Sequence, residues 1–477
     1  MQWRAIFLIT GAMTAFLGAL MLPCILIDLA GASPTWRAFA LSAFLAGVLG
    51  AAMAVSTIGG STSLDRRSAF FLTAFIWMWL PLIGALPFML TGFSFTNAYF
   101  EAMSGLTTTG ATVITGLDAQ PRGLLLWRAL MQGFGGIGII VVAIAVLPIL
   151  RVGGMQLMAI ESSDTSDKIL PRATEIAGQT TALYLVLVGI CALAYAFAGM
   201  NGFEAITHAL TTMSTGGFST KDASMGGFAA GGADLAAIPF MLIAALPFSL
   251  LVLAARGDLR TITRDDQVRS FLVITALAIL AVVLYRSGAD LFEADWRNTA
   301  FSVVSVVTGT GYATADYALW GPFVDLIMMI LMILGACAGS AACGLKVFRL
   351  RVMIAAMTAY AKTMFAPNRV MVVRYAGRNV ALADVDAVLL YATLYVVAFA
   401  VGSAVLAFCG LDLTSAASAA ASAMGCVGPG LGPLIGPAST YQAIPDAAKW
   451  VASLLMLIGR LEIFPVLLVL SPFFWRR

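Results

Sequence analysis

Four stretches of the sequence share one pattern, in which a short segment of small and polar residues runs into a glycine turn. They read NAYFEAMSGLTTTGA from Asn97, EAITHALTTMSTGGF from Glu204, NTAFSVVSVVTGTGY from Asn298 and SAASAAASAMGCVGP from Ser415. Aligned without a gap on the last glycine of each turn, they carry a hydroxyl residue six positions earlier in every copy. The anchor glycines are Gly110, Gly217, Gly311 and Gly428, and the hydroxyl residues are Ser104, Thr211, Ser305 and Ser422. This internal repeat predicts four similar units arranged around one axis.

The composition excludes a soluble globular protein. Hydrophobic residues make up 61% of the 477 residues and charged residues only 11%, whereas a soluble domain is about a quarter charged. The net charge of +3 does not indicate nucleic acid as a partner. The six cysteines form no C-x-x-C pair, so disulfides and a zinc site are not expected. The first apolar run, residues 5–27, is 23 residues long, which exceeds the roughly 7–15 of a signal peptide and predicts a retained span.

Ten apolar segments are candidate membrane spans, for which about 20 residues are typical. Two lead the chain, and the others flank the glycine turns in the order long helix, short re-entrant helix, turn, long helix. The segments are 5–27, 38–58, 69–90, 124–150, 180–197, 235–254, 271–285, an interrupted one from 323, 387–408 and 447–470. The sequence therefore predicts an all-α polytopic membrane protein, with two extra N-terminal transmembrane helices and four pseudo-fourfold pore repeats around one central pore. The predicted boundaries are 1–62 for the N-terminal helices and 63–172, 173–262, 263–378 and 379–477 for the repeats.

Loop charges predict the orientation. Basic residues gather on one side, at 66–67, 151–172, 256–269, 346–378 and 476–477, and the positive-inside rule makes that side cytoplasmic. The opposite side carries the acids Asp118, Asp222, Asp290, Glu293, Asp295, Asp316, Asp412 and Asp446. These would form a mildly acidic vestibule that concentrates cations. The alternative is that they are ordinary solvated loop residues.

The turns themselves have the chemistry of a cation filter. Glycine adopts positive φ without penalty, so consecutive carbonyl groups can be turned toward an axis, where they replace the hydration shell of an ion. The short helix before each turn directs its partly negative C-terminal end the same way. The candidate filter residues are Thr108, Thr109, Gly110, Thr215, Gly216, Gly217, Thr310, Gly311, Cys426, Val427 and Gly428. The alternative is that these small residues only permit close helix packing.

The four turns resemble the filter loops of the Trk/Ktr/HKT potassium transporters. The matching motifs are TTTGAT at 107–112, STGGFST at 214–220, TGTGYATAD at 308–316 and GCVGPGLGP at 425–433. The two leading helices are similar to those of the bacterial TrkH-like potassium-uptake subunits, and the resemblance covers essentially the whole chain. It implies K⁺ uptake across the bacterial inner membrane, with K⁺ as the transported ion and no organic cofactor. It also implies a homodimer controlled by cytoplasmic, nucleotide-binding TrkA-like regulatory subunits.

Two further features fit a gate below the filter. Residues 335–345, GACAGSAACGL, interrupt the second long helix of the third repeat, and in the resembling family this segment is an intramembrane loop that opens or blocks the pore. Arg460 lies inside the predicted span 447–470, where a charge usually faces a cavity or a partner. The candidate gate residues are Gly335, Gly339, Ser340, Gly344, Lys346 and Arg460. The alternatives are a packing kink for the loop and an ion pair for the arginine; Glu462, two residues away, is a poor intrahelical partner.

Other classes of function are less well supported. An enzyme would need a nucleophile–base pair or a metal cluster, which one histidine and scattered carboxylates do not supply, so no catalysis is expected. His208, inside the second short helix, is expected to pack or hydrogen-bond, with a proton relay as the alternative. An H⁺- or Na⁺-coupled cation symporter is the rival transport mechanism, although such a protein usually has a midplane carboxylate or inverted repeats.

Overall fold

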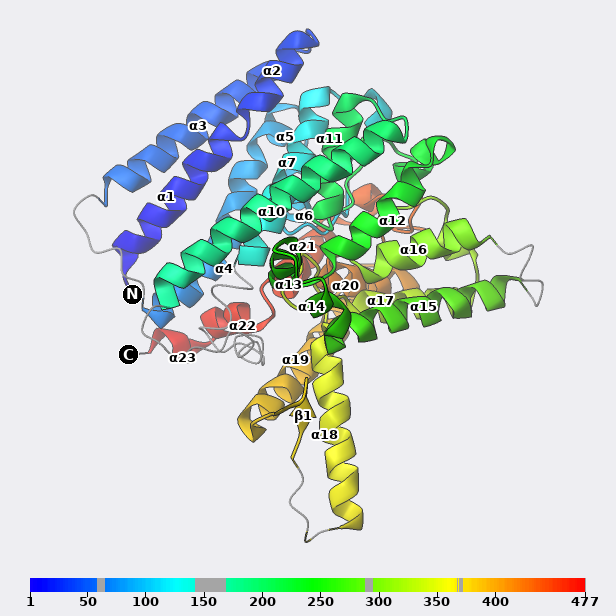
Figure 1. Ribbon diagram of the computed structural model, residues 1–477. Coiled ribbons are helices and arrows are strands. Elements are labelled where there is room, and N and C mark those ends of the chain that lie inside the picture. Colours follow the sequence, from blue (N-terminus) through cyan, green and yellow to red (C-terminus); the bar gives the residue numbers. More distant parts are fainter. Residues whose placement is uncertain (58–64, 142–168, 288–294, 367, 369–371, 477) are drawn as a thin grey trace.

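The computed structural model describes residues 1–57, 65–141, 169–287, 295–366, 368 and 372–476, and these are almost entirely helical (Figure 1). Among them, the only strands are β1 (Arg374–Tyr375) and β2 (Arg378–Asn379), which pair antiparallel in a short hairpin. Within the described residues, seven helices are long and apolar enough to cross a membrane, and two bent helix pairs raise the number to as many as nine.

The two N-terminal spans form a hairpin beside the rest of the molecule, coloured blue in Figure 1. The first comprises α1 (Trp3–Ala19) and α2 (Leu22–Ala30), and the second is α3 (Trp36–Val55). Helices α1 and α3 meet at Gly11 and Gly50, where an added Cβ atom would lie less than 3.0 Å from the facing helix. Small residues allow this close approach in the absence of a hydrophobic driving force within the bilayer. Both spans were predicted from the sequence.

Each glycine turn is preceded by a short helix, as the sequence pattern predicted. These helices are α6 (Phe95–Leu106), α11 (Gly202–Met213), α16 (Trp296–Val307) and α20 (Leu413–Gly425). With 12 or 13 residues each, they are shorter than the roughly 20 residues needed to cross a bilayer. They enter the molecule and end near its centre, where they are largely buried.

The four short helices begin in the same way. The side chain of the N-cap residue accepts a hydrogen bond from the backbone N–H three residues later, which satisfies one of the free donors of the first turn. The N-cap residues are Ser94, Asn201, Asp295 and Asp412, with donor–acceptor distances of 3.4, 2.9, 3.1 and 3.1 Å. Two residues predicted to form an acidic vestibule, Asp295 and Asp412, therefore cap helices.

Longer helices surround the short ones. Before them come α4 (Arg66–Gly84) with α5 (Leu86–Leu90), α10 (Ile169–Phe197), α15 (Asp266–Ser287) and α19 (Leu382–Phe408). After them come α7 (Arg122–Val141), α12 (Ala233–Ala244) with α13 (Phe248–Ala255), α17 (Pro322–Leu334), and α21 (Asp446–Arg460) with α22 (Phe464–Leu470). Shorter pieces connect them: η1 (Leu117–Ala119), η3 (Ser224–Gly231), α14 (Arg260–Arg264), η4 (Tyr317–Leu319), η5 (Tyr441–Ala443) and α23 (Pro472–Trp475). Helix α18 (Val347–Phe365) extends away from the body in yellow in Figure 1.

Two spans predicted as continuous helices are broken. The span 447–470 bends by 117° between α21 and α22, and Glu462 and Ile463 at the break have φ of 58° and 61°. The span 235–254 is interrupted between α12 and α13. In both, a proline follows the break, Pro465 and Pro247. Proline lacks an N–H donor and its ring clashes with the carbonyl four residues earlier, which ends the preceding helix. Of the predicted span 124–150, residues beyond Val141 lie outside the described residues.

Candidate functional site

The four glycine turns have the same backbone hydrogen bonds. In each, the N–H of the residue before the anchor glycine donates to the carbonyl oxygen of the aligned hydroxyl residue. The bonds run from Thr109 to Ser104, Gly216 to Thr211, Thr310 to Ser305 and Val427 to Ser422, at 2.9, 2.8, 2.9 and 2.9 Å. Four turns with one hydrogen-bond pattern are structurally equivalent, so the sequence alignment identified a true internal repeat.

The turns also share an unusual backbone conformation. The residue two positions before the anchor has positive φ in all four copies: Thr108 at 53°, Thr215 at 52°, Gly309 at 74° and Cys426 at 51°. The anchor glycines follow at 85°, 71°, 75° and 101°. Positive φ costs a residue with a Cβ atom roughly 1–2 kcal/mol, so three of the four turns hold a strained residue. Such strain is concentrated at functional sites, where the surrounding structure enforces it.

The four turns close into a ring. An ideal Cβ atom at Gly110 would lie less than 3.0 Å from the carbonyl oxygen of Gly216, and one at Gly217 equally close to that of Thr310. The same holds for Gly311 and the carbonyl of Val427, and for Gly428 and the carbonyl of Thr109, at 2.7 Å. Each anchor glycine thus packs directly against the residue before the anchor in the next copy, and the fourth copy returns to the first. The structure brings all the predicted filter segments together.

One face of this ring opens into a cavity of about 560 Å³ that all four anchor glycines line. Of the predicted vestibule acids, only Asp222 lines the cavity, together with Lys221 and Arg128. Asp118 accepts a hydrogen bond from the Asp222 backbone at 3.2 Å, and Asp316 caps η4. Asp290 and Glu293 lie outside the described residues. The acidic vestibule therefore remains a prediction: Asp222 lines the cavity, whereas Asp295, Asp316 and Asp412 cap helices.

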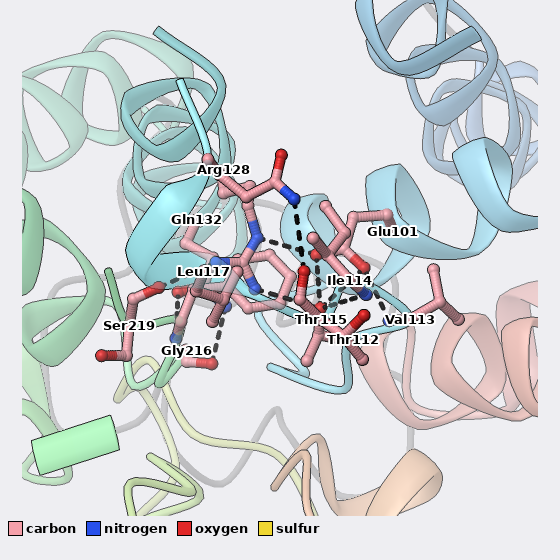
Figure 2. A network of polar contacts seen from close by, with 12 residues as sticks. Glu101, Thr112, Val113, Ile114, Thr115, Leu117, Arg128, Gln132, Gly216 and Ser219 are labelled. Atoms are coloured by element: carbon pink, nitrogen blue, oxygen red, sulfur yellow. Dashed lines mark hydrogen bonds and ion pairs between the residues drawn. The ribbon is translucent and has the colours of Figure 1, made fainter. Parts of the chain in front are cut away.

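A buried ion pair that sequence reasoning missed connects the first and second turns (Figure 2). Arg128 of α7 donates from Nε to Oε1 of Glu101 at 2.8 Å and from Nη1 to the Ser219 carbonyl at 2.8 Å, and both charged side chains are 1% exposed. Glu101 in turn accepts from the backbone N–H of Val113 at 2.9 Å. The pair therefore joins the first short helix to the backbone beyond both turns.

Gln132, one helical turn after Arg128, holds the second turn itself. Its Nε2 donates to the carbonyl oxygen of Gly216 at 2.6 Å, and its Oε1 accepts from the N–H of Phe218 at 3.1 Å. The two polar side chains lie on one face of α7, four residues apart, as (i, i+4) neighbours do. This polar pair inside a predicted apolar span was the sequence signal for the contact.

The predicted intramembrane loop, residues 335–345, joins α17 to α18 in irregular backbone. Its carbonyl at Gly339 accepts from the N–H of Phe248 at 2.9 Å, and the Ser340 hydroxyl donates to the Cys337 carbonyl at 2.6 Å. Gly335 and Gly344 pack directly against each other at positive φ. The loop lies directly beside the ring, because the Cβ of Ala342 is 3.9 Å from the Cβ position at Gly309. The loop is buried in protein, the condition under which non-helical backbone is tolerated inside a membrane protein.

Arg460 binds this loop. Its Nη1 donates to the carbonyl oxygen of Ala341 at 2.8 Å and lies 3.3 Å from Sγ of Cys343, while Nη2 donates to the carbonyl of Gly135 in α7 at 3.1 Å. The side chain is 1% exposed and its Nε has no partner. Arg460 ends α21 at the helix break, and it does not lie in the middle of a continuous span as predicted. Its contacts tie the loop to the first repeat.

Lys346, another predicted gate residue, belongs to a buried ion cluster with Glu462. From the sequence, Glu462 is expected to be a poor partner for Arg460, and its partners are instead Lys346 and Arg349. The Nζ of Lys346 donates to Oε1 of Glu462 at 2.6 Å, and Arg349 Nη2 donates to Oε2 of the same carboxylate. All three residues are less than 5% exposed. Because Lys346 follows the loop and Glu462 lies in the α21–α22 break, the cluster fastens the two irregular segments to each other.

Replacing Glu462 by alanine is expected to destabilise the protein strongly, because Lys346 and Arg349 would both lose the buried carboxylate that they contact. Breaking a buried pair from one side typically costs about 3–5 kcal/mol. The measurement is the thermal unfolding midpoint of the purified protein in detergent. Asp266→Ala is the matched control, since the side chains of Asp266 and its partner Arg351 are 37% and 45% exposed. Equal midpoints for the two variants would show that the cluster does not hold the break.

His208 has the hydrogen-bonding role expected for it. Its Nδ1 lies 2.8 Å from the Glu204 carbonyl and its Nε2 lies 3.1 Å from Oγ of Ser219, so it links the second short helix to the backbone after its turn.

These features define a class: a multi-span membrane protein that builds a closed ring from four re-entrant helix–turn units, the architecture of a transmembrane transporter. The TrkH family model, described as a cation transport protein, matches residues 36–477, and the chain belongs to this family. The family comprises membrane cation transporters, so the protein is a transporter of the bacterial inner membrane and not an enzyme.

Named relatives match over the whole chain. The Trk system potassium uptake protein TrkI of Halomonas elongata is 40% identical over 488 residues, covering 100% of this chain and 98% of the relative. TrkH of Escherichia coli K12 is 35% identical, with both proteins fully covered. The crystal structure of the potassium transporter TrkH from Vibrio parahaemolyticus superposes with a TM-score of 0.91 at 35% identity over all of both chains.

Proposed function

We propose that this chain is the K⁺-translocating subunit of a potassium uptake system. The proposal rests on the closed ring of turns. In this ring, each anchor glycine packs against the carbonyl oxygen of the residue that precedes the anchor glycine in the next copy. A ring of backbone from four equivalent turns, each following the C-terminal end of a short helix, suits a dehydrated monovalent cation. The names of the full-length relatives support K⁺ as that cation.

The filter is proposed to consist of the residues aligned in the four turns. Thr109, Gly216, Thr310 and Val427 supply the carbonyls that contact the neighbouring anchor glycines. The Arg128–Glu101 pair and Gln132 keep the first two turns at a fixed separation. A rigid support of this kind matters because discrimination between K⁺ and Na⁺ depends on the geometry and number of the coordinating oxygens.

The gate is proposed to be the intramembrane loop, held by Arg460. The loop adjoins the ring at Ala342, and Arg460 fixes it through the carbonyl of Ala341. A fixed guanidinium beside the pathway also opposes the passage of a cation. Opening then requires the loop to leave these contacts, which couples ion flow to movement of α17 and α18 on either side of it.

The decisive experiment measures K⁺ and Na⁺ flux into liposomes that contain the purified protein, with and without an imposed proton gradient. K⁺-selective flux that needs no gradient supports the proposal. Flux without selectivity would exclude the filter, and flux that depends on the proton gradient would favour the symporter. Growth of a K⁺-uptake-deficient bacterial strain at low K⁺ provides the same comparison in cells.

A cytoplasmic nucleotide-binding regulatory subunit and a second copy of the chain are the proposed partners. The basic cytoplasmic segments 256–269 and 346–378 are predicted to dock the regulator, but Lys346 and Arg349 of the second segment are buried with Glu462 and cannot meet a partner. Exposed bases remain in both segments: Arg351, Lys362, Arg374 and Arg378 in the second, and Arg256, Arg260, Arg264 and Arg269 around α14 in the first. The four arginines around α14 lie within one short segment, interspersed with Asp258, Asp265 and Asp266, and are proposed to bind an acidic surface on the regulator.

Reversing the charge of these four arginines to glutamate is expected to abolish co-purification with the regulatory subunit. The interaction of the unchanged protein should weaken as salt rises, since the Debye length is about 10 Å at 0.1 M salt. Arg37→Glu serves as the control because Arg37 is also exposed but lies in the first turn of α3. Unchanged co-purification of the fourfold variant would show that the regulator docks elsewhere.

A further inference from the structure

A tyrosine outside the four turns holds the anchor glycine of the fourth turn. The Oη of Tyr441, the first residue of η5, donates a hydrogen bond to the carbonyl oxygen of Gly428 at 3.0 Å. Tyr441 is 3% exposed and lines the same cavity as the anchor glycines. Among the described residues, Gly428 is the only anchor glycine whose carbonyl accepts a hydrogen bond from a side chain. The fourth anchor is therefore supported differently from the other three.

Tyr441 also reaches the first copy of the repeat, which is the neighbour of the fourth in the ring of turns. Its backbone N–H donates to the carbonyl oxygen of Thr112 at 2.8 Å, and its aromatic ring packs against that of Phe100 in α6, with the centroids 5.4 Å apart. The Thr112 hydroxyl in turn donates to Glu101 at 2.9 Å. Tyr441 thus connects the fourth turn to the buried Glu101–Arg128 pair, which joins the first two turns.

The contact between the fourth and first turns is the loosest of the four in the ring. The Cβ position at Gly428 lies 2.7 Å from the carbonyl oxygen of Thr109, farther than the corresponding distance at each of the other three anchors. Pro429 follows this anchor and has no N–H to donate. After the second anchor, by contrast, Phe218 donates its N–H to Gln132. The fourth turn therefore needs a support from outside the turn, and Tyr441 supplies one.

We infer that Tyr441 is a positioning residue for ion selectivity, which fixes the direction of the Gly428 carbonyl and the distance between the fourth and first turns. This role depends on the proposed filter. A carbonyl oxygen has two lone pairs, so the bond from Tyr441 leaves one for an ion. Without the hydroxyl, the carbonyl and the loose contact are free to adjust to the smaller Na⁺. Discrimination should then fall, because it depends on the arrangement of the coordinating oxygens.

The test replaces Tyr441 by phenylalanine and measures the ratio of K⁺ to Na⁺ flux in proteoliposomes. Phenylalanine keeps the aromatic ring against Phe100 and the backbone bond to Thr112, so only the hydroxyl is lost. The ratio should fall about fivefold, the factor that corresponds to one hydrogen bond of typical net strength. An unchanged ratio would overturn the inference.

Tyr317→Phe is the matched control. Tyr317 is the first residue of η4, the corresponding short helix after the third turn. It is as buried as Tyr441, with an exposed fraction of 0%, but its hydroxyl has no hydrogen-bond partner. Removing this hydroxyl should leave the flux ratio unchanged. An equal fall of the ratio in both variants would also overturn the inference, because the bond to Gly428 would then have no specific effect.

A second measurement distinguishes a role in selectivity from a role in stability alone. A bound ion raises the thermal unfolding midpoint of the protein in detergent, so the unchanged protein should unfold at a higher temperature in KCl than in NaCl of equal concentration. Tyr441→Phe should narrow this difference, and Tyr317→Phe should keep it. An equal drop of the Tyr441→Phe midpoint in both salts, with the flux ratio unchanged, would show that Tyr441 only stabilises the fold.

The unchanged protein separates this inference from the proposed function. If it discriminates between K⁺ and Na⁺ and Tyr441→Phe discriminates equally well, the inference is wrong and the proposed filter stands. If the unchanged protein itself shows no preference for K⁺ in flux or in unfolding, the proposed filter is wrong and the role of Tyr441 in selectivity is refuted with it.

Discussion

Replacing Gly311 by alanine is expected to abolish most of the discrimination between K⁺ and Na⁺. The residue has φ of 75°, and an added Cβ atom would collide with the carbonyl oxygen of Val427 and lie 2.9 Å from Cδ of Pro429. Neither neighbour can withdraw easily, because both belong to the backbone or ring of the next turn. The third and fourth turns must separate, which changes the geometry of the carbonyls around the ion.

The measurement is the ratio of K⁺ to Na⁺ flux in proteoliposomes, which should fall at least about tenfold, or about 1.4 kcal/mol of discrimination. The equivalent substitutions at Gly110 and Gly217 should act alike, and Gly428 should be the mildest because its nearest clash is at 2.7 Å. Gly189→Ala is the control, since no atom lies within 4 Å of an added Cβ there. Wild-type selectivity in all four ring variants would refute the filter assignment.

The repeat could be predicted from the sequence because its cause is local. Positive φ at an anchor favours glycine, and the carbonyl six residues earlier is within reach of the turn in any chain that folds this way. The recurrence of a hydroxyl residue at this position suggests one shared role for its side chain, but the hydroxyl groups have different partners in different copies. Ser305 donates from Oγ to the Tyr312 carbonyl at 2.7 Å, while the Thr211 hydroxyl meets the Tyr312 hydroxyl at 2.5 Å. Only the backbone carbonyls of these residues have an equivalent role.

The contacts that support the ring could not be predicted, because they join segments far apart in the chain. Arg128 and Gln132 reach Ser219 and Gly216, which are 91 and 84 residues away. A polar residue inside an apolar span signals that some partner exists. It does not say which one. The same limit applies to Glu462, whose partners Lys346 and Arg349 lie more than 110 residues earlier.

The two helix breaks could have been predicted from the prolines in the sequence. Pro247 and Pro465 each interrupt a predicted span, and hydrophobicity alone treats proline as compatible with a transmembrane segment. At these two positions the proline ring clashes with the carbonyl four residues earlier, and the preceding helices α12 and α21 end there. The second break is important for the site, since it places Arg460 at a helix end with its guanidinium against the intramembrane loop.

Replacing Arg460 by alanine is expected to raise K⁺ flux through the purified chain alone, without the proposed regulatory subunit. The substitution removes the hydrogen bonds to Ala341 and Gly135 that hold the loop to the first repeat. It also removes a buried positive charge, and a unit charge acts on an ion about 4 Å away with about 4 kcal/mol at an effective dielectric constant near 20. Both changes lower the barrier to a cation, so flux should increase at least about tenfold.

Two further variants separate the charge from the tether. Arg460→Lys keeps the charge but loses the forked geometry that reaches two carbonyls at once, so an intermediate flux would show that both contribute. Deleting residues 339–341 should raise flux with Arg460 in place, because it removes the part of the loop that the arginine and α13 hold. The ratio of K⁺ to Na⁺ flux should stay unchanged in all three, since none of them alters the turns. Lower flux in folded Arg460→Ala and in the folded deletion would mean that these residues form the open pathway, and that the barrier to K⁺ lies elsewhere.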